Sequence, residues 1–490
     1  MFSDELVALQ RYVAEYEAVG RAIDGGDEPE AWRRLADCRR TRSSLEEIDR
    51  VISERKITPT PEGLLTLRQM MAHKRLITTL DEKVTAWLKH NASRSSDHLV
   101  QATLPLGWDA ELDLVVVCKP ATDFVAALQR AQQKRVLSWL PEQSTDELLK
   151  TLDGLSAEPP PRRLLIYPPD AKIEAALRPI IEEIVGAWQA SHRTFLAKGE
   201  LWRKNTEENL ATILRTPTVN SLAGRFSGRP AIVVSPGPSL SKNIEQLKPL
   251  QDRAVFITSV QALISLTPVD VIADFAVLSE SIDMRYTFAG YPIEKCGSLV
   301  VPFNAHPSSY RLHPRTYCYA ANNQFDKWAL AQRGEDCRLP GGGSVSTFAF
   351  MLALKLDCSA IILVGQDLSF PDGKMYIDSN VHGKSKMALS GDGQSFDVAM
   401  SGLTAEGSLY DDERNLHGKP AWLPGYYGGK VATSPDFEVF HRWFVRAAAH
   451  YGKDHRLYNC TEGGAFIAGM QHLPLGEVGA RELTEPFSKQ

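Results

Sequence analysis

The stretch Pro230–Ser239, with the sequence PAIVVSPGPS, decides the fold of this chain. Its first half, Pro230–Val234, is an apolar run rich in β-branched residues, which predicts a strand buried on both faces. The turn Ser235–Ser239 follows at once, and Ser241 can then cap a helix that runs to Leu250. A buried strand that leads through a glycine turn into a helix indicates the beginning of a parallel α/β sheet.

The same alternation continues along the chain to about residue 400. Short apolar runs predict further strands at Ala254–Thr258, Phe275–Leu278, Ser298–Pro302 and Ala360–Val364, with helices at Ala262–Leu266 and Val345–Leu356. Strands that alternate with helices in this way predict the α/β fold class, here a Rossmann-like parallel sheet. In such a sheet, ligands bind beyond the carboxyl ends of the strands.

The regions outside this core have other patterns. Apolar residues recur at helical spacing through residues 1–92, and a polar stretch at His90–Asp97 predicts a linker. Two strand-like runs, Leu112–Lys119 and Arg163–Tyr167, are each followed by a helical pattern, and residues 180–215 predict one long connecting helix. We therefore expect a helical N-terminal region at 1–92, a small α/β module at 98–195, the Rossmann-like core at 196–400 and a mixed, partly helical C-terminal extension at 401–490 that completes the core.

Composition excludes several classes of protein. The 490 residues carry 55 Lys and Arg against 60 Asp and Glu, a net charge of −5, and this mild acidity argues against nucleic acid as a partner. The seven cysteines form no CxxC pair, so a disulfide framework and a zinc ribbon are both disfavoured, and a reducing, cytoplasmic location is expected. The N-terminus lacks the layout of a signal peptide, and no apolar run approaches the roughly 20 residues that a membrane helix needs.

Two glycine loops, Gly237–Ser239 and Gly341–Ser344, precede helices of the same predicted sheet. A helix N-terminus presents unpaired N–H groups and the positive end of the helix dipole, so it suits a phosphate or a carboxylate. Neither loop is a P-loop, because no Lys-Ser/Thr follows the glycines, and neither reads GxGxxG, which disfavours ordinary ATP hydrolysis and NAD binding. The alternative is that the glycines only make the strand-to-helix turn.

Polar side chains stand next to several predicted strands. Asp274 and Glu280 flank the strand Phe275–Leu278, Asp367 follows Ala360–Val364, and Asn304 follows Ser298–Pro302. A carboxylate at the carboxyl edge of a sheet can hold a ribose, a divalent metal or a proton. The alternative is that these residues cap helices or make turns, as Asp often does.

The segment Tyr376–Lys386 follows a turn at Pro371–Gly373 and predicts a polar loop over the strand edge. His382 lies in this loop and is a candidate general base, although a loop histidine can also be only a solvated residue. The sequence contains no HExxH, GxSxG or EF-hand pattern, and we predict no metal site from it.

Four motifs together resemble a known family. They are VVSPGPSL at Val233–Leu240, ADFAVLSE at Ala273–Glu280, GGGSVSTFAFMLALKLDCSAIILVGQDLSF at Gly341–Phe370 and YNCTEGGAFIAG at Tyr458–Gly469. In this order they resemble the Maf (motility-associated factor) family, glycosyltransferases that modify flagellin and whose core is similar to bacterial sialyltransferases. The resemblance covers about residues 195–470.

This resemblance implies an inverting transfer of a nonulosonic acid, such as pseudaminic or legionaminic acid, from a CMP-activated donor to Ser/Thr hydroxyls of flagellin in the cytoplasm. No cofactor is then required, although Mg²⁺ is compatible with such a reaction. The chain departs from the family pattern in two places, with Ser235 in place of a glycine and Glu280 in place of an aspartate. The residues that fall on the donor motifs or on the adjacent strand ends are Gly237, Pro238, Ser239, Asp274, Glu280, Asn304, Gly342, Gly343, Ser344, Val345, Gln366, Glu462 and Gly463.

For the chemistry we expect His382 to act as the general base, with Asp367 as the competing candidate and Tyr376 as a donor to the leaving phosphate. Two other functions stay open. One is a pterin-type diphosphokinase that uses ATP with Mg²⁺ held by carboxylates such as Asp274, Glu280 and Asp367. The other is a non-catalytic chaperone that binds flagellin.

Overall fold

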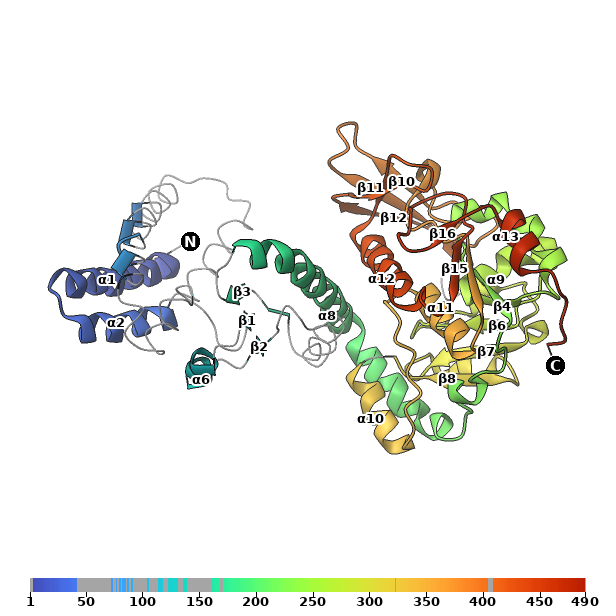
Figure 1. Ribbon diagram of the computed structural model, residues 1–490, viewed down its shortest axis with the longest axis horizontal. Helices are drawn as coiled ribbons and strands as arrows, with labels where there is room; N and C mark the ends of the chain where they lie inside the picture. The colour runs from blue at the N-terminus through green and yellow to red at the C-terminus, as the bar shows by residue number, and fades with distance from the viewer. Residues whose placement is uncertain are drawn as a thin grey trace. The chain divides into compact units, whose positions relative to one another are not determined.

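The structure is a computed structural model. It describes residues 3–41, 113–117, 122–130, 135–138, 163–167, 171–321, 323–403 and 409–489, together with single positions between 72 and 90, residue 104 and residues 160 and 161. The chain divides into two compact units, residues 1–192 and residues 193–490 (Figure 1).

The first unit contains helices and a small parallel sheet. Helices α1 (Ser3–Asp24) and α2 (Glu28–Thr41) pack on each other and bury Tyr16 and Leu35. The sheet has the order β2-β1-β3, with β1 at Leu114–Val117, β2 at Val136–Ser138, β3 at Leu164–Tyr167 and helix α6 at Thr122–Arg130. The strands β1 and β3 were predicted and β2 was missed. Of the predicted linker His90–Asp97, only His90 is described, and it is helical.

Helix α8 (Ala171–Ile213) leads into the second unit. The sequence patterns predicted a helix after Arg163–Tyr167 and a long connecting helix over 180–215, and in the structure the two form one continuous helix. In its C-terminal half, Asn205 donates through Nδ2 to the carbonyls of Ser281 (2.7 Å) and Asn304 (3.0 Å). This helix therefore fixes loops that follow two strands of the second unit.

The second unit is built on an eight-stranded parallel sheet with the order β16-β15-β9-β4-β5-β6-β7-β8. This confirms the predicted Rossmann-like α/β core. The strands are β4 (Pro230–Val234), β5 (Val255–Ser259), β6 (Phe275–Val277), β7 (Ser298–Pro302), β8 (Thr316–Tyr319), β9 (Ala360–Val364), β15 (Arg456–Asn459) and β16 (Gln471–His472).

The strand order reverses between β4 and β9. From β4 the chain adds β5 to β8 on one side, and it then returns to place β9 on the other side of β4. The two strands pair in register from Pro230↔Ala360 to Val234↔Val364. In an open parallel sheet, the loops beyond the carboxyl ends of two such strands diverge and leave a crevice.

Both faces of this sheet are buried. Along β4, Ala231 and Val233 pack into one apolar cluster, while Ile232 and Val234 pack into the other. Helix α11 (Val345–Lys355) is apolar around most of its circumference and packs against β4, β5 and β6. The other helices of this unit are α9 (Val260–Leu266), α10 (Gln324–Arg333), α12 (Pro435–Tyr451) and α13 (Leu475–Glu482).

The predicted helix from Ser241 to Leu250 is wrong. Three short 3₁₀ turns replace it, η3 (Pro238–Lys242), η4 (Ile244–Gln246) and η5 (Lys248–Leu250). Asn243 interrupts them with a non-helical backbone, and its buried side chain donates to the carbonyl of Cys460 at 2.7 Å. Pro249 then lacks the N–H that a continuous helix needs and would clash with the preceding turn.

The C-terminal part also contains antiparallel elements that the sequence patterns did not predict. Strands β10 (Lys386–Leu389), β11 (Phe396–Leu403) and β12 (Leu409–Gly418) form one sheet, and β13 (Ala421–Pro424) pairs with β14 (Lys430–Thr433). The remaining 3₁₀ turns are η2 (Val219–Leu222), η6 (Thr267–Val269), η7 (Arg285–Phe288), η8 (Ile293–Lys295), η9 (Pro307–Arg311) and η10 (Pro371–Gly373).

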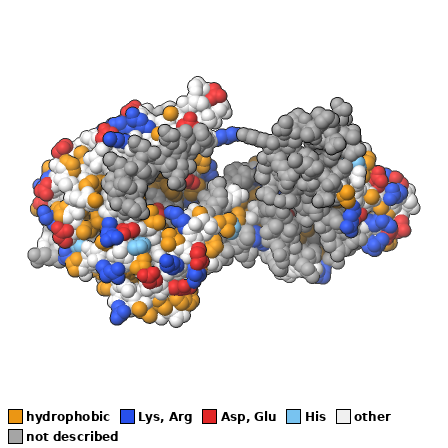
Figure 2. Space-filling model, turned by 180° about the vertical axis from the view of Figure 1, so that it is seen from behind, with side chains coloured by type: hydrophobic (Ala, Val, Ile, Leu, Met, Phe, Trp, Pro, Cys, Tyr) orange, Lys and Arg blue, Asp and Glu red, His pale blue; other side chains and the backbone are white. Residues whose placement is uncertain are grey.

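The described surface carries both signs of charge. On the face seen in Figure 2, Lys and Arg side chains lie among Asp and Glu side chains over the described surface. Within the described part of the chain, no helix combines the length and the apolar character that crossing a membrane requires.

Candidate functional site

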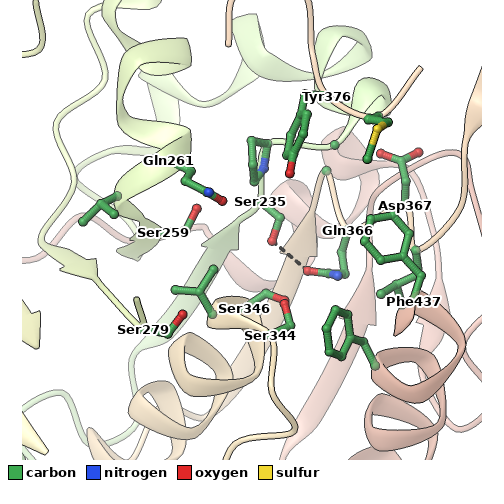
Figure 3. A pocket seen from close by; sticks show the side chains of 18 of the residues that line it. Ser235, Ser259, Gln261, Ser279, Ser344, Ser346, Gln366, Asp367, Tyr376 and Phe437 are labelled. Carbon is green, nitrogen blue, oxygen red and sulfur yellow. Dashed lines mark hydrogen bonds between the residues drawn. The ribbon is translucent and has the colours of Figure 1, made fainter. Parts of the chain in front are cut away.

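A cavity of about 250 Å³ lies beyond the carboxyl ends of β4, β5, β6 and β9, at the point where the strand order reverses. Residues of both glycine loops line it, including Gly237 from the first and Gly343 and Ser344 from the second. The structure thus brings together two segments that are about a hundred residues apart in sequence, as a shared binding site requires. Figure 3 shows the side chains around this cavity.

The first glycine loop is closed by the protein itself. The N–H of Gly237 donates to the carbonyl of Gly365 at 3.0 Å, and the N–H of Ser239 donates to Asp367 Oδ2 at 3.0 Å. A Cβ at position 237 would clash with both Asp367 Oδ2 and the Gly365 carbonyl, so the loop needs glycine there. The predicted anion-binding role of this loop is therefore not supported, because a carboxylate of the chain occupies it and no α-helix follows it.

The second glycine loop is open toward the cavity. Helix α11 begins directly after it, and none of the described residues accepts a hydrogen bond from the N–H groups of Gly343, Ser344, Val345 and Ser346. Gly343 has a φ of +91°, a conformation that favours glycine. These four groups and the dipole of an 11-residue helix give the cavity a positive end built from backbone atoms alone.

Gln366 adds a donor to the wall of the same cavity. Its Oε1 accepts a hydrogen bond from the Ser235 hydroxyl at 2.7 Å, and its backbone N–H donates to Thr461 Oγ1 at 2.9 Å. The side chain is only 6% exposed, and no described residue accepts from its Nε2 amide, which lies in the cavity wall. Ser235 therefore orients the amide so that its two N–H groups remain available to a ligand (Figure 3).

Asp367 follows Gln366 and is 3% exposed. Burial raises the pKa of this carboxyl to about 6, and the hydrogen bonds from Ser239 partly offset that effect. Its Oδ1 atom is buried and without a partner. Behind it, a Cβ at Gly464 would clash with the Asp367 backbone, and one at Gly463 would clash with Ser239 Oγ, so these two glycines pack the Asp367 turn against the first loop.

The opposite end of the cavity is polar. Ser259 and Gln261 come from the end of β5 and the start of α9, and Ser279 and Glu280 follow β6. Glu280 forms an ion pair with Lys198 of α8 at 2.9 Å, and its side chain is 38% exposed. Tyr376 lies over the middle of the cavity (Figure 3).

His382 does not line the cavity. It is 6% exposed, its Nδ1 lies 3.3 Å from the Ser401 carbonyl, and its ring packs against Tyr376 with 5.7 Å between centroids. Burial lowers the pKa of this imidazole. The predicted lid residue is thus part of the packing behind Tyr376.

Asp274 is a correction to the predicted site. It precedes β6, so it lies at the amino edge of the parallel sheet, away from the cavity. There it accepts hydrogen bonds from the Phe256 N–H at 2.7 Å and from Lys489 Nζ at 2.6 Å. Burial raises the pKa of this carboxyl, and Lys489 opposes the effect. Its role is structural, and it cannot contribute to donor binding.

Six other predicted residues support the site without lining it, and two of them, Ser239 and Gly463, are described above. Pro238 begins η3, and the backbone of Asn304 accepts from Asn205. Glu462 holds the C-terminal loop, where its Oε1 accepts from the Leu475 N–H at 3.0 Å. The N–H of Gly342 donates to Thr347 Oγ1 at 2.8 Å, and a side chain at 342 would clash with Trp443.

Sequence reasoning missed several lining residues: Ser259, Gln261, Ser279, Ser346, Ser369, Met375, Phe437 and Phe440. Ser259 and Ser279 stand at or just after the ends of strands, so their positions carried a signal that could have been used. Phe437 and Phe440 gave no such signal, because aromatic residues on one face of an amphipathic helix usually indicate packing.

The cavity has no ready-made metal centre. Over the described ranges, no three or more His, Cys, Asp or Glu side chains converge in a way that could hold a metal ion. Asp274 is at the other edge of the sheet, and Glu280 and Asp367 are each engaged by another group of the protein.

Two comparisons with known proteins each give a match. Residues 204–373 match a family model described as MptE-like, 6-hydroxymethylpterin diphosphokinase MptE-like. A similar solved structure is that of the MAf glycosyltransferase from Magnetospirillum magneticum AMB-1, with 18% identity and a TM-score of 0.45, over 78% of this chain and 58% of that one. The chain thus spans less than two thirds of the length of that protein, and a comparison with curated proteins finds no match.

The range that matches the MptE-like model begins in α8, contains β4 to β9, and ends at Gly373. It therefore includes both glycine loops and the Asp367 turn, which are the segments that first suggested a family. The matched range is about a third of the chain.

Proposed function

We propose that the chain is a glycosyltransferase that moves a nonulosonic acid from a CMP-activated donor to Ser/Thr hydroxyls of flagellin in the cytoplasm. The observation that carries the proposal is the open N-terminus of α11. The residues that carry its unpaired N–H groups line the same cavity as Gln366, whose Nε2 amide has no acceptor among the described residues. Donors in this arrangement suit the phosphate of a nucleotide. The identity of the donor sugar and of the acceptor comes from the resemblance of the motifs.

The charge of the cavity favours a donor with few negative charges. No Lys or Arg occurs among its lining residues, all of which lie in the described part of the chain. A triphosphate is usually held by such cations or by a metal ion. A CMP-nonulosonate carries only one phosphodiester and one carboxylate, which backbone N–H groups and neutral side chains can accommodate.

In the proposed transfer, the bond between the sugar and the CMP phosphate breaks, and the acceptor hydroxyl forms a new bond to the same sugar carbon. Negative charge develops on the leaving CMP phosphate. The N–H groups at the start of α11 belong to residues that line the cavity, so they can stabilise this charge without reorganisation. Tyr376 lies above the same region and is the candidate hydroxyl donor to the leaving group.

The acceptor hydroxyl must lose a proton, and the geometry favours Glu280 as the base. Glu280 lines the polar end of the cavity with an accessible carboxylate. Asp367 is nearly fully buried and holds the first glycine loop, and His382 lies behind Tyr376. We therefore assign positioning roles to Asp367 and His382.

The test is ligand binding followed by transfer. We expect CMP to raise the melting temperature of the full chain more than ATP with Mg²⁺ does, because ligands that bind only the folded state stabilise it. With a CMP-nonulosonate and unmodified flagellin, intact-mass measurement should show flagellin gaining one or more sugar masses. An unchanged mass, together with CMP binding, would favour the chaperone over the enzyme.

A second candidate function is a pterin diphosphokinase, which the description of the MptE-like family model favours. The described residues do not fit the carboxylate-held Mg²⁺ that this reaction would need, because Asp274 is remote and no three His, Cys, Asp or Glu side chains converge in the described part of the chain. Incubation with ATP, Mg²⁺ and a hydroxymethylpterin separates the two functions. AMP release that EDTA abolishes would support the diphosphokinase, whereas sugar transfer that survives EDTA would support the glycosyltransferase.

A further inference from the structure

We propose that Phe437 and Phe440 of α12 form the subsite for the nucleobase of the donor. This inference rests on the proposed function, which places a nucleotide in the cavity, and it assigns the end of the cavity at which the base lies. The polar end, with Ser259, Gln261 and Ser279, then receives the sugar.

The two rings are presented to the cavity by the same face of α12. They are three positions apart, which places them side by side on a helix, and their centroids are 6.1 Å apart. Both side chains are only partly buried and line the cavity. Phe444 on the same helix is fully buried and belongs to the core. The helix thus uses different aromatic residues for packing and for the cavity wall.

The rings are rigidly supported from behind. Phe370 stacks on Phe437 with 5.2 Å between centroids and 20° between ring planes. Phe437 also packs against a small apolar cluster that contains Phe370 and Met387. A wall that is fixed in this way can stack on a planar ring without first losing side-chain freedom.

Phe440 is adjacent to the proposed phosphate site. An added Cβ at Gly343 would lie 3.3 Å from the edge of the Phe440 ring, so the ring rests against the bare backbone of the second glycine loop. A nucleotide whose phosphate binds the N–H groups of α11 therefore meets an aromatic face on one side and the serine-rich end on the other (Figure 3). Stacking of a base on an aromatic side chain is a recurrent mode of nucleotide recognition.

The experiment compares two ligands that differ only in the base-bearing part, CMP and ribose 5-phosphate, by calorimetry on the full chain. Because stacking of the base stabilises the complex, we expect the wild type to bind CMP about tenfold or more tightly than ribose 5-phosphate. Phe440→Leu keeps the apolar bulk and removes the aromatic ring. We expect it to reduce this preference at least threefold and to leave the affinity for ribose 5-phosphate unchanged. Phe437→Leu tests the second ring in the same way.

Trp328→Ala is the matched control, because Trp328 is an exposed aromatic residue on α10 outside the cavity, and the preference should not change. The subsite would be overturned if Phe440→Leu lowered the affinity for both ligands equally, or if the wild type bound both ligands with equal affinity. Either result would leave the phosphate site in place. Binding of neither ligand to the wild type would overturn the proposed function itself. Thermal unfolding of each variant shows that the comparison is made on folded protein.

Discussion

The two glycine loops look alike in sequence and differ in structure. Both combine glycine and serine before an expected helix, yet the first is closed by the Asp367 carboxylate and the second opens into the cavity. The difference arises from the segment that comes after each loop. Prolines break the chain after the first into 3₁₀ turns, whereas an 11-residue apolar helix begins after the second. Similar glycine loops can therefore be closed by a side chain of the protein or stay open toward a cavity.

The largest expected effect is on the rate of the proposed transfer in the cavity beside the second, open loop. Glu280→Gln removes the proposed base but keeps the shape of the side chain, so we expect the transfer rate to fall about 100- to 10,000-fold with the affinity for CMP unchanged. Mass measurement of flagellin over time gives the rate, and calorimetry gives the affinity.

Asp283→Asn is the control for Glu280→Gln, since Asp283 is nearby, is paired with Arg285 and does not line the cavity. A Glu280→Gln enzyme with near wild-type turnover would return the role of base to Asp367 or His382.

The next prediction compares how a substitution in each loop changes the free energy of unfolding. Gly237→Ala places a methyl group against the Asp367 carboxylate and the Gly365 backbone, so we expect a loss of about 2–4 kcal/mol in the free energy of unfolding. Denaturant unfolding measures this loss.

Gly343→Ala is the comparison for Gly237→Ala. The added methyl group contacts only the edge of the Phe440 ring, at 3.3 Å, and the residue must adopt a positive φ. We therefore expect a smaller loss in the free energy of unfolding, about 1–2 kcal/mol. The same variant should bind CMP more weakly. The opposite ranking of the two variants would contradict the distinction between an anchoring loop and a binding loop.

A third prediction concerns the carboxylate that closes the first loop. Because burial raises the pKa of Asp367 to about 6, the folded state binds this proton more tightly than the unfolded state does. Ionisation therefore costs stability as the pH rises from about 4 to 6, and the full cost is present above that range. Asp367→Asn removes the titration, so the variant should gain about 2–3 kcal/mol relative to the wild type between pH 4 and pH 7.5.

Asn keeps an oxygen that can accept from Ser239, and any cost of its amide group is the same at both pH values. The readout is thus the change in the stability difference with pH, measured by denaturant unfolding. A difference that stays constant from pH 4 to pH 7.5 would show that Asp367 is not perturbed in this way.

The smallest expected effect concerns the hydroxyl that links the loops. Ser235→Gly deletes the hydrogen bond to Gln366 Oε1 and leaves the amide free to rotate, so CMP affinity should fall by about two- to tenfold. Calorimetry with CMP measures the loss. Ser241→Ala is the control. Ser241 is exposed, and its hydroxyl donates to the Pro238 carbonyl, so the affinity for CMP should not change.

The central strands could be predicted from sequence because each is a short apolar run between turns. The observed bounds of β4, β7 and β9 equal the predicted ones. Strand β8 (TYCY) was missed because it lies at the edge of the sheet and its alternation with polar residues is weak, and β16 is only two residues long. Among the site residues, Gly343, Ser344, Gln366 and Asp367 were placed in the cavity by the rule that loops meet beyond the carboxyl ends of strands.

The errors have equally definite physical causes. Asp274 was assigned to the site because it adjoins a strand, but a residue before a parallel strand lies at the opposite edge from one that comes after it. His382 was assigned from its residue type, and only the packing of Tyr376 against it shows that it is buried behind the cavity. The contribution of α12 depends on contacts between residues that are about a hundred positions apart, and no local pattern reveals them.

The absence of lysine and arginine from the cavity wall has a consequence for how such a site responds to its surroundings. Amide groups of the main chain do not titrate in the physiological range, and partial charges in a recess are screened by salt less than exposed ammonium or guanidinium groups are. The contribution of these amide groups to the proposed nucleotide binding should accordingly change little with ionic strength. No single charge-neutralising substitution can remove it, because the attracting dipole belongs to the backbone of α11.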